Sequence, residues 1–414
     1  MIDRRVVITG LGCITSIAES HEELFEALCQ SKSGVSYIES FDTAEYPVKI
    51  GGEAKAFDVG RYLNAREAKR MDRFTQMATA SAVQAVKDSG LDFEKEDTHR
   101  AGVIVGTGIG GIKEIEDQHV RLLNKGPRKV SPFCVPKLMG NAACGCISIE
   151  YGLKGPNLCV VTACASASHA IGEAFWNVLT GRSDICITGG SEAALTPVGL
   201  ASFCSLKALS TRNEEPQLAS RPFDKDRNGF ILAEGAGILI LEEYEHAKKR
   251  GAKIYAEMVG YGATGDGHHI TAPLEDGSGA AKAMEIALRQ AKLNPEKIDY
   301  INAHGTSTQL NDAGESKAIR SVFGSGAYNI PVSSSKSCLG HSLGASGAVE
   351  LIACAKTIEK GRIHPTANLQ AVSEDCDPKM DFVPNQPRDV DVQYALSNSL
   401  GFGGHNCTLI IGKV

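Results

Sequence analysis

The sequence predicts an α/β protein in which two similar halves are built from layers of strands and helices. Short β-branched runs alternate with helical stretches along the chain, which is typical of helices that pack on a sheet. The segment AVKDSGLDFEKEDTHRAGVIVGTG has an echo in ALRQAKLNPEKIDYINAHGT, because each holds a helix, a short acidic connection and a strand that ends in glycine. Such self-similarity indicates an internal duplication.

Strands and helices are expected in alternation through the first part of the chain. β-branched runs predict strands over residues 5–9, 102–105, 158–161, 184–188 and 238–241. Helical stretches cover residues 73–88 and 165–180. The alternation continues the pattern on which the α/β prediction rests.

The boundary between the halves is expected near residues 250–252. A basic helix end meets a glycine there, and a strand over residues 254–259 leads into a second glycine turn. We therefore expect an N-terminal half of residues 1–252 and a C-terminal half of residues 253–414. Two facing α/β units would place their strand-end loops around one shared cleft.

Composition is that of an ordinary soluble protein. The chain has 414 residues, 43% of them hydrophobic, and a net charge of -6 with 22% charged residues. This balance favours neither nucleic-acid binding nor a disordered acidic tail, and no apolar run predicts a membrane partner. The start, MIDRRVVITGLG, lacks the apolar region of a signal peptide, so a cytoplasmic location is expected.

The 13 cysteines are scattered and form no C-x-x-C pair, so most are expected to be reduced and buried. Cys164 differs because it lies at a bend of small residues between a strand and a helix, in NLCVVTACASASHAIG. A sulfur at a helix N-terminus lies near free N–H groups, which lower the pKa of a thiol. Cys164 is therefore a candidate nucleophile, although a buried core cysteine is the alternative interpretation.

Two histidines in glycine-rich turns of the second half strengthen this hypothesis. They are His304 in NAHGTST and His341 in KSCLGHSLGASGAVE. A lone histidine is often only a hydrogen-bonded structural residue, but one cysteine with two histidines suits thioester chemistry that needs polarised carbonyl groups. Zinc is the competing hypothesis, and it is disfavoured because the short local ligand pairs of zinc sites are absent from the sequence.

Residues 106–111, GTGIGG, match the G-x-G-x-x-G pattern of dinucleotide sites. Such a site also needs an acidic residue that closes the next strand about twenty residues later. A polar segment and KGPRKVSPF follow instead, so a closely packed turn is the better interpretation.

Motifs from the start to the end of the chain occur in an order typical of one family. They are VVITGLG, TACASASHAIG, ALSTRNEEPQLASRPFDKDRNGFILAEGAG, HGTSTQLND, SSSKSCLGHSLGASGAVE and NSLGFGGHN. With them nearly the whole chain resembles the β-ketoacyl-acyl carrier protein synthases, and within these the elongating type II enzymes of bacterial fatty acid synthesis. The resemblance implies the thiolase fold with duplicated α/β halves in five α-β-α-β-α layers, and a homodimer.

The resemblance also implies a two-step reaction that needs no cofactor. Cys164 would take an acyl group from the phosphopantetheine arm of acyl carrier protein, and a malonyl thioester would then lose CO2 and attack it. His304 and His341 would donate Nε2–H to the enolate oxygen that forms. The backbone N–H groups of Cys164 and Phe402 would bind the acyl carbonyl oxygen, and Phe402 would gate the acyl pocket.

Further residues receive roles from the same resemblance. Lys336 would support the site electrostatically, with Glu350 as its buried partner. Contacts with the pantetheine arm are implied for Thr271, Thr306 and Thr308. Contacts with the acyl chain in its pocket are implied for Ile109 and Phe203.

Carrier protein is acidic, so docking requires basic groups despite the negative net charge. Arg66, Lys69 and Arg70 are expected on one face of a helix in REAKRMD, and Lys207 matches another docking position. A solvated charged surface is the alternative interpretation.

Three other functions stay open at this point. A non-catalytic subunit like the chain-length factors of polyketide systems would lack the nucleophile. A ketosynthase that starts from acyl-CoA would pair one histidine with asparagine. A stand-alone polyketide-type ketosynthase would use the same residues as a fatty acid enzyme, and the flanking ACASASH and the Gln309 position depart slightly from the type II pattern.

Overall fold

The computed structural model describes residues 4–414 and places ten strands in one sheet that two equivalent halves share. The first half contributes β1 (Val6–Ile14), β4 (Ala101–Gly106), β5 (Asn157–Val160), β6 (Ile185–Glu192) and β7 (Gly235–Glu243). The second half contributes β8 (Ala256–Gly265), β9 (Tyr300–Asn302), β10 (Val332–Ser333), β13 (Tyr394–Gly401) and β14 (His405–Gly412).

Both halves have the same strand order. From edge to centre the first half reads β5-β4-β6-β7-β1 and the second reads β10-β9-β13-β14-β8. In each half the first three strands of that order pair in parallel. The third strand pairs antiparallel with the fourth, and the fourth pairs antiparallel with the fifth. The halves join where β1 pairs antiparallel with β8. This repeat confirms the predicted duplication.

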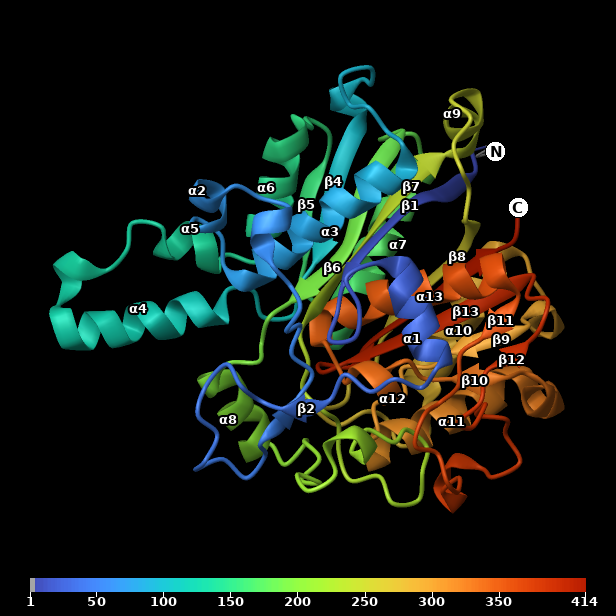
Figure 1. The fold of residues 1–414 in the computed structure, drawn as a ribbon. Coiled ribbons are helices and arrows are strands. Elements are labelled where there is room, and N and C mark those ends of the chain that lie inside the picture. Colours follow the sequence, from blue (N-terminus) through green and yellow to red (C-terminus); the bar gives the residue numbers. More distant parts are fainter. Residues whose placement is uncertain (1–3) are drawn as a thin grey trace.

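Helices cover both halves and fill the space between them (Figure 1). Helices α3 (Arg73–Ser89) and α6 (Ala142–Tyr151) pack on the outer face of the first half, and α10 (Ser278–Ala291) and α11 (Gln309–Phe323) belong to the outer core of the second. Helices α7 (Ser166–Leu179) and α13 (Ser346–Lys360) lie in the central core. The five predicted layers, α-β-α-β-α, are confirmed.

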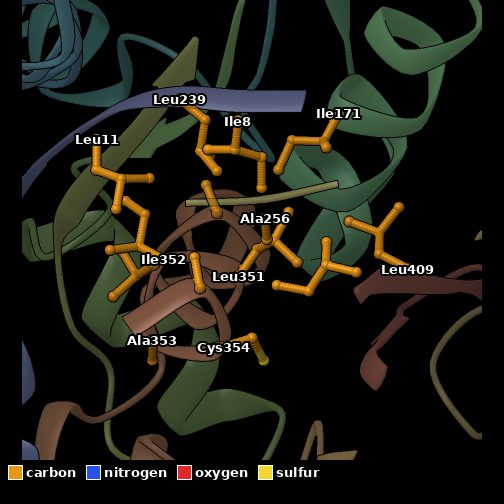
Figure 2. Packing of buried hydrophobic residues seen from close by; sticks show 14 of the residues in the cluster. Ile8, Leu11, Ile171, Leu239, Ala256, Leu351, Ile352, Ala353, Cys354 and Leu409 are labelled. Carbon is orange, nitrogen blue, oxygen red and sulfur yellow. The ribbon is translucent and has the colours of Figure 1, made fainter. Parts of the chain in front are cut away.

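The central core is packed from both halves (Figure 2). Ile8 of β1, Ile171 of α7, Ile352 of α13 and Leu409 of β14 are all fully buried in it. Alternate residues of one strand enter different cores, since Leu239 of β7 lies in the central core and Ile238 in the outer one. Burial of each such side chain stabilises the fold by roughly 1.5–3 kcal/mol.

Strands and helices occur where the sequence predicts them, with shifted ends. The helix expected over residues 73–88 is α3, and the strand expected over 254–259 begins at Ala256 and extends to Gly265. The remaining elements are short or peripheral: α1 (His21–Cys29), α2 (Ala65–Ala68), α4 (Ile112–Lys125), α5 (Cys134–Leu138), α8 (Pro197–Ser205), α9 (Tyr244–Lys249), α12 (Lys336–Leu339), β2 (Ser36–Tyr37), β3 (Ile50–Gly51), β11 (Arg362–Ile363) and β12 (Arg388–Asp389).

The turns that lead into the two central helices have the same shape. Ala163 precedes α7 with φ of 50°, and Leu343 precedes α13 with φ of 44°, a left-handed conformation that is uncommon for residues with side chains. The duplication thus extends to the strained bend at which Cys164 lies. Within residues 4–414 no helix is long and apolar enough to cross a membrane.

Candidate active site

A cavity of about 780 Å³ lies where the loops of both halves meet. Its wall includes Cys164 and Phe402 together with His304 and His341. Six more of the residues singled out from the sequence also line it: Ile109, Phe203, Lys207, Thr271, Thr306 and Thr308. The shared cleft expected between facing halves is therefore present.

Cys164 sits in the 3-10 turn Ala163–Ala165, directly before α7. The turn is held by Ser166, whose Oγ accepts from the Thr162 N–H at 2.8 Å and donates to the Ala163 carbonyl at 2.7 Å. These bonds offset the cost of the left-handed Ala163 and leave the thiol at the cavity wall, 8% exposed.

Burial raises the pKa of the Cys164 thiol to about 12, so the predicted lowering is wrong. Removing the sulfur from water penalises the thiolate more than its neighbours stabilise it. The Lys336 charge and the backbone N–H groups of Phe402 and Cys164 act in the opposite direction. The backbone N–H groups of Cys164 and Phe402, which oppose the rise in pKa, are the pair expected to bind the acyl carbonyl oxygen.

His304 follows β9, and hydrogen bonds from the backbone at this position hold it in place. The N–H groups of His304 and Gly305 each donate to the Glu315 carboxylate at 2.8 Å. The Nζ of Lys336 lies 3.3 Å from His304 Nδ1. Burial, followed by the Lys336 charge, holds the pKa of His304 well below its usual value, so the ring is neutral.

His341 faces His304 across the same part of the cavity, with ring centroids 5.2 Å apart at 86°. It follows the short helix α12 rather than a strand, and its N–H donates to the Ile231 carbonyl at 2.7 Å. Its Nδ1 lies 3.0 Å from the Ser346 Oγ, whose hydroxyl can donate to it. Burial first, and then Lys336, lowers the pKa of His341 well below its usual value.

Lys336 and Glu350 form an ion pair behind the histidines and outside the cavity wall. Both side chains are 2% exposed. Burial raises the pKa of Glu350 although Lys336 opposes the shift. The ammonium group therefore contacts a carboxylate on one side and an imidazole on the other.

Phe402 lies at the tip of the hairpin between β13 and β14. The following Gly403 and Gly404 have φ of 84° and 74°, which favours glycine. Gly401 packs closely on residues 162–165, the nucleophile turn that carries Cys164. A Cβ at Gly401 would lie 2.8 Å from the Thr162 carbonyl oxygen. The role of Phe402 as a gate stays a prediction.

The expected substrate contacts gather along the cavity. Thr306 and Thr308 are linked through their hydroxyls at 2.9 Å, and Thr271 lies on the wall with them. Phe203 packs edge-on against Phe230, and Phe230 in turn packs against His341. Ile109 is 43% exposed, so it is a wall residue and not part of the core.

The four basic residues expected to dock the carrier protein are exposed, but the prediction that three of them share one face of a helix is wrong. Helix α2 ends at Ala68, so only Arg66 lies within it, while Lys69 caps it and Arg70 lies beyond. Asn64 starts this helix by capping it, and four residues are too few to give one basic face. Lys207 is exposed at the cavity mouth.

The glycine motif at residues 106–111 is a packing turn, as expected. A Cβ at Gly106 would meet the Ser166 backbone at 2.4 Å. The amide groups of Gly108 and Ile109 donate to the buried Glu192 carboxylate at 2.6 and 3.3 Å. A protein carboxylate thus occupies the donors that a phosphate would need.

Glu192 and Glu315 shape the site and were missed from the sequence. Each is fully buried and accepts from backbone amides next to a catalytic loop, and burial raises the pKa of each to about 7. Glu315 could have been noticed, because an acidic residue at a core position of a helix needs a buried partner.

Metal ligation is not supported by the described part of the chain, because residues 4–414 contain no group of three or more potential ligands arranged to hold an ion. All 13 cysteines are free, and Cys164 is one of the buried ones.

Comparisons with known proteins agree along the whole chain. The model of the beta-ketoacyl synthase N-terminal domain matches residues 3–247, and that of the C-terminal domain matches residues 255–370. A 3-oxoacyl-(acyl-carrier-protein) synthase 2 of Synechocystis sp. is 50% identical over 99% of this chain and 98% of its own length. The enzyme of the same name from Vibrio cholerae is 48% identical over the full length of both chains.

Solved structures are similar at lower identity. The ishigamide ketosynthase/chain length factor has a TM-score of 0.93 at 36% identity, covering 99% of each chain. A ketosynthase solved in complex with a type II polyketide acyl carrier protein has a TM-score of 0.92 at 36% identity, covering 99% of this chain and 100% of the other.

Proposed function

Because the chain belongs to the beta-ketoacyl synthase family, we propose that it lengthens acyl chains by condensing a malonyl thioester with an acyl group held on Cys164. It is an acyltransferase, a 3-oxoacyl-(acyl-carrier-protein) synthase of fatty acid elongation. The observation that carries the residue roles is that one cavity brings together Cys164, two neutral histidines and the Phe402 amide.

In the first step the Cys164 sulfur attacks an acyl thioester and forms a new C–S bond while the old one breaks. The proton lost by the thiol ends on the released carrier thiol, so no proton is consumed. The N–H groups of Cys164 and Phe402 stabilise the oxyanion that develops between these states. Because burial holds the pKa of the thiol at about 12, the proton leaves as the bond forms.

In the second step a malonyl thioester loses CO2, and its thioester oxygen gains negative charge as an enolate. The Nε2–H groups of His304 and His341 donate to that oxygen, because Lys336 donates to Nδ1 of the first ring and Ser346 can donate to Nδ1 of the second. The enolate carbon then bonds to the acyl carbon, the C–S bond to Cys164 breaks, and the released thiolate takes up one proton from solvent.

Acyl carrier protein is the proposed partner, with substrates on its phosphopantetheine arm and no bound cofactor. Arg66, Lys69, Arg70 and Lys207 are exposed and would attract an acidic partner. Thr271, Thr306 and Thr308 would contact the arm inside the cavity, and Ile109 and Phe203 would limit the acyl chain.

A homodimer is proposed from the edge of the sheet. Edge strand β5 carries the exposed apolar residues Leu158 and, just after it, Val161, at 52% and 60%. At the opposite edge, both residues of β10 are buried. An open apolar edge strand pairs readily with a second copy.

The boundary between residues 252 and 253 and the cytoplasmic location stay predictions. Polyketide elongation is the second candidate, since one similar structure, at 36% identity, is the ketosynthase of a type II polyketide acyl carrier protein. Fatty acid elongation is favoured, because full-length relatives with that role reach 50% identity.

The function is tested by incubating the protein with acyl carrier proteins that carry saturated acyl chains of increasing length. Peptide mass spectrometry then locates the acyl adduct. We expect an acyl adduct on Cys164 and a product two carbons longer after malonyl carrier protein is added. An adduct on another cysteine, or no adduct, would contradict the assignment.

A further inference from the structure

A third buried histidine lies beside the nucleophile turn and has no part in the steps above. His169 is on α7, five residues after Cys164, and is 8% exposed. Its Nδ1 lies 2.8 Å from Oγ1 of Thr162, two residues before Cys164. The ring also has a polar contact with the Asn406 backbone and packs edge-on against His405 of the same hairpin, with ring centroids 6.3 Å apart. His169 therefore contacts both the nucleophile turn and the hairpin that carries Phe402.

The two contacts require opposite roles of the two ring nitrogens. The Asn406 contact raises the pKa of the ring, which is the effect of a carbonyl that accepts an N–H. The Nδ1 atom is then left to accept from the Thr162 hydroxyl. Burial, the largest effect, and the nearby His405 lower the pKa of His169 to about 4. A ring that is neutral near pH 7 can donate from one nitrogen and accept at the other.

The spacing between these two segments matters for acyl transfer. The N–H groups of Cys164 and Phe402 come from different halves of the chain, yet both must point at one thioester oxygen. Gly401 brings the two backbones into contact, because a Cβ there would lie 3.2 Å from the Cys164 nitrogen. Glycine contributes no side chain that could hold the hairpin in place, whereas His169 bonds Thr162 on one side and contacts Asn406 and His405 on the other.

We propose that His169 is a positioning residue for acyl transfer, which bridges Thr162 and Asn406 and so holds the Cys164 and Phe402 amides at the spacing that one oxyanion needs. The inference rests on the proposed function, because the acyl thioester supplies that oxygen. Malonyl decarboxylation depends instead on His304 and His341, which are oriented by Lys336 and Ser346.

The test compares the two half-reactions in His169→Ala, His169→Asn and His169→Gln. Acyl transfer is followed as the single-turnover appearance of the Cys164 adduct, and decarboxylation as CO2 release from malonyl carrier protein alone. Asparagine places a polar atom near the Nδ1 position and can keep the Thr162 bond, while glutamine reaches the Nε2 position and can keep the polar contact with Asn406. Thermal unfolding of each variant identifies any that does not fold.

We expect acyl transfer to slow at least about tenfold in His169→Ala, because a small displacement of a donor is costly, while decarboxylation stays within about twofold. His169→Asn and His169→Gln, which each keep one of the two contacts, should fall between wild type and alanine. Equal slowing of both half-reactions would indicate a purely structural role, and acyl transfer at the wild-type rate would also overturn the proposal.

Ser168→Ala is the matched control. Ser168 also bridges α7 and β13, through Oγ of Ser399 at 2.7 Å, but it does not bond the nucleophile turn. Both half-reactions should stay within about twofold in this variant, and slowing of acyl transfer like that of His169→Ala would contradict the proposal. If wild type forms no Cys164 adduct, the proposed function fails; if wild type reacts and His169→Ala reacts equally fast, only the positioning role fails.

Discussion

The Nζ of Lys336 lies 3.3 Å from Nδ1 of His304 and also pairs with the buried carboxylate of Glu350. An ammonium group only donates hydrogen bonds, so Nδ1 accepts and the single proton of the neutral ring is on Nε2. A buried charge therefore decides which nitrogen of His304 can donate to substrate. Glu350 in turn compensates that charge.

Replacing the histidines should separate the two half-reactions. In His304→Ala or His341→Ala, we expect CO2 release from malonyl carrier protein to fall about 10²–10³-fold, the usual cost of losing one oxyanion donor. Acyl transfer to Cys164 should fall far less, because its donors are backbone amides. Rapid-quench measurement of both steps checks this, and unchanged decarboxylation in both variants would remove the enolate role.

The Lys336–Glu350 pair should be strongly coupled. Glu350→Leu leaves a buried ammonium group without its carboxylate, which we expect to cost about 3–5 kcal/mol of unfolding free energy. The double variant Lys336→Met with Glu350→Leu removes both charges and should lose less. Urea unfolding of wild type, both single variants and the double variant measures the coupling. Additive losses would show that the pair contributes nothing specific.

Cys164 should react with iodoacetamide at a rate that rises with pH. Burial holds the pKa of the thiol at about 12, so the thiolate fraction should increase about tenfold for each pH unit below that value. We expect no plateau between pH 7 and pH 10. Mass spectrometry of the Cys164 peptide follows the rate, with Cys164→Ala as the control for other cysteines. A plateau near pH 8 would mean that the thiol is activated in the resting protein.

Docking should depend on the basic residue at the cavity mouth. In Lys207→Glu we expect the KM for acyl carrier protein to rise roughly fivefold with kcat little changed, because a rim charge acts on encounter. Added salt should shrink the difference. Lys297→Glu is the control. Lys297 is exposed and lies just before β9, whereas His304 follows the other end of that strand. Equal effects of both variants would point to net charge alone.

The open edge strand should be needed for association. Leu158→Asp places a charge on the exposed face of β5, so we expect light scattering to give the mass of one chain where wild type gives two. Val414→Asp, at a residue 56% exposed on the C-terminus, should leave the mass unchanged. A monomeric wild type would contradict the homodimer.

Local signals explain how much of the fold was predictable. β-branched runs located β1 and β7, and the echo between the halves anticipated a repeat that the strand order displays. The basic face in REAKRMD was wrong, because Asn64 caps a helix that ends after Ala68. Such a short helix gives no periodic pattern, so its end depends on local capping and on contacts with distant residues.

By itself the sequence determined the candidate chemistry, since Cys164 in a bend of small residues and His304 and His341 in glycine-rich turns are patterns of neighbours along the chain. Only the tertiary structure decided their chemical state. The thiol has a raised pKa, and the position of the His304 proton depends on Lys336, 32 residues away. Burial and long-range charge set these properties, and neither leaves a periodic mark in the sequence.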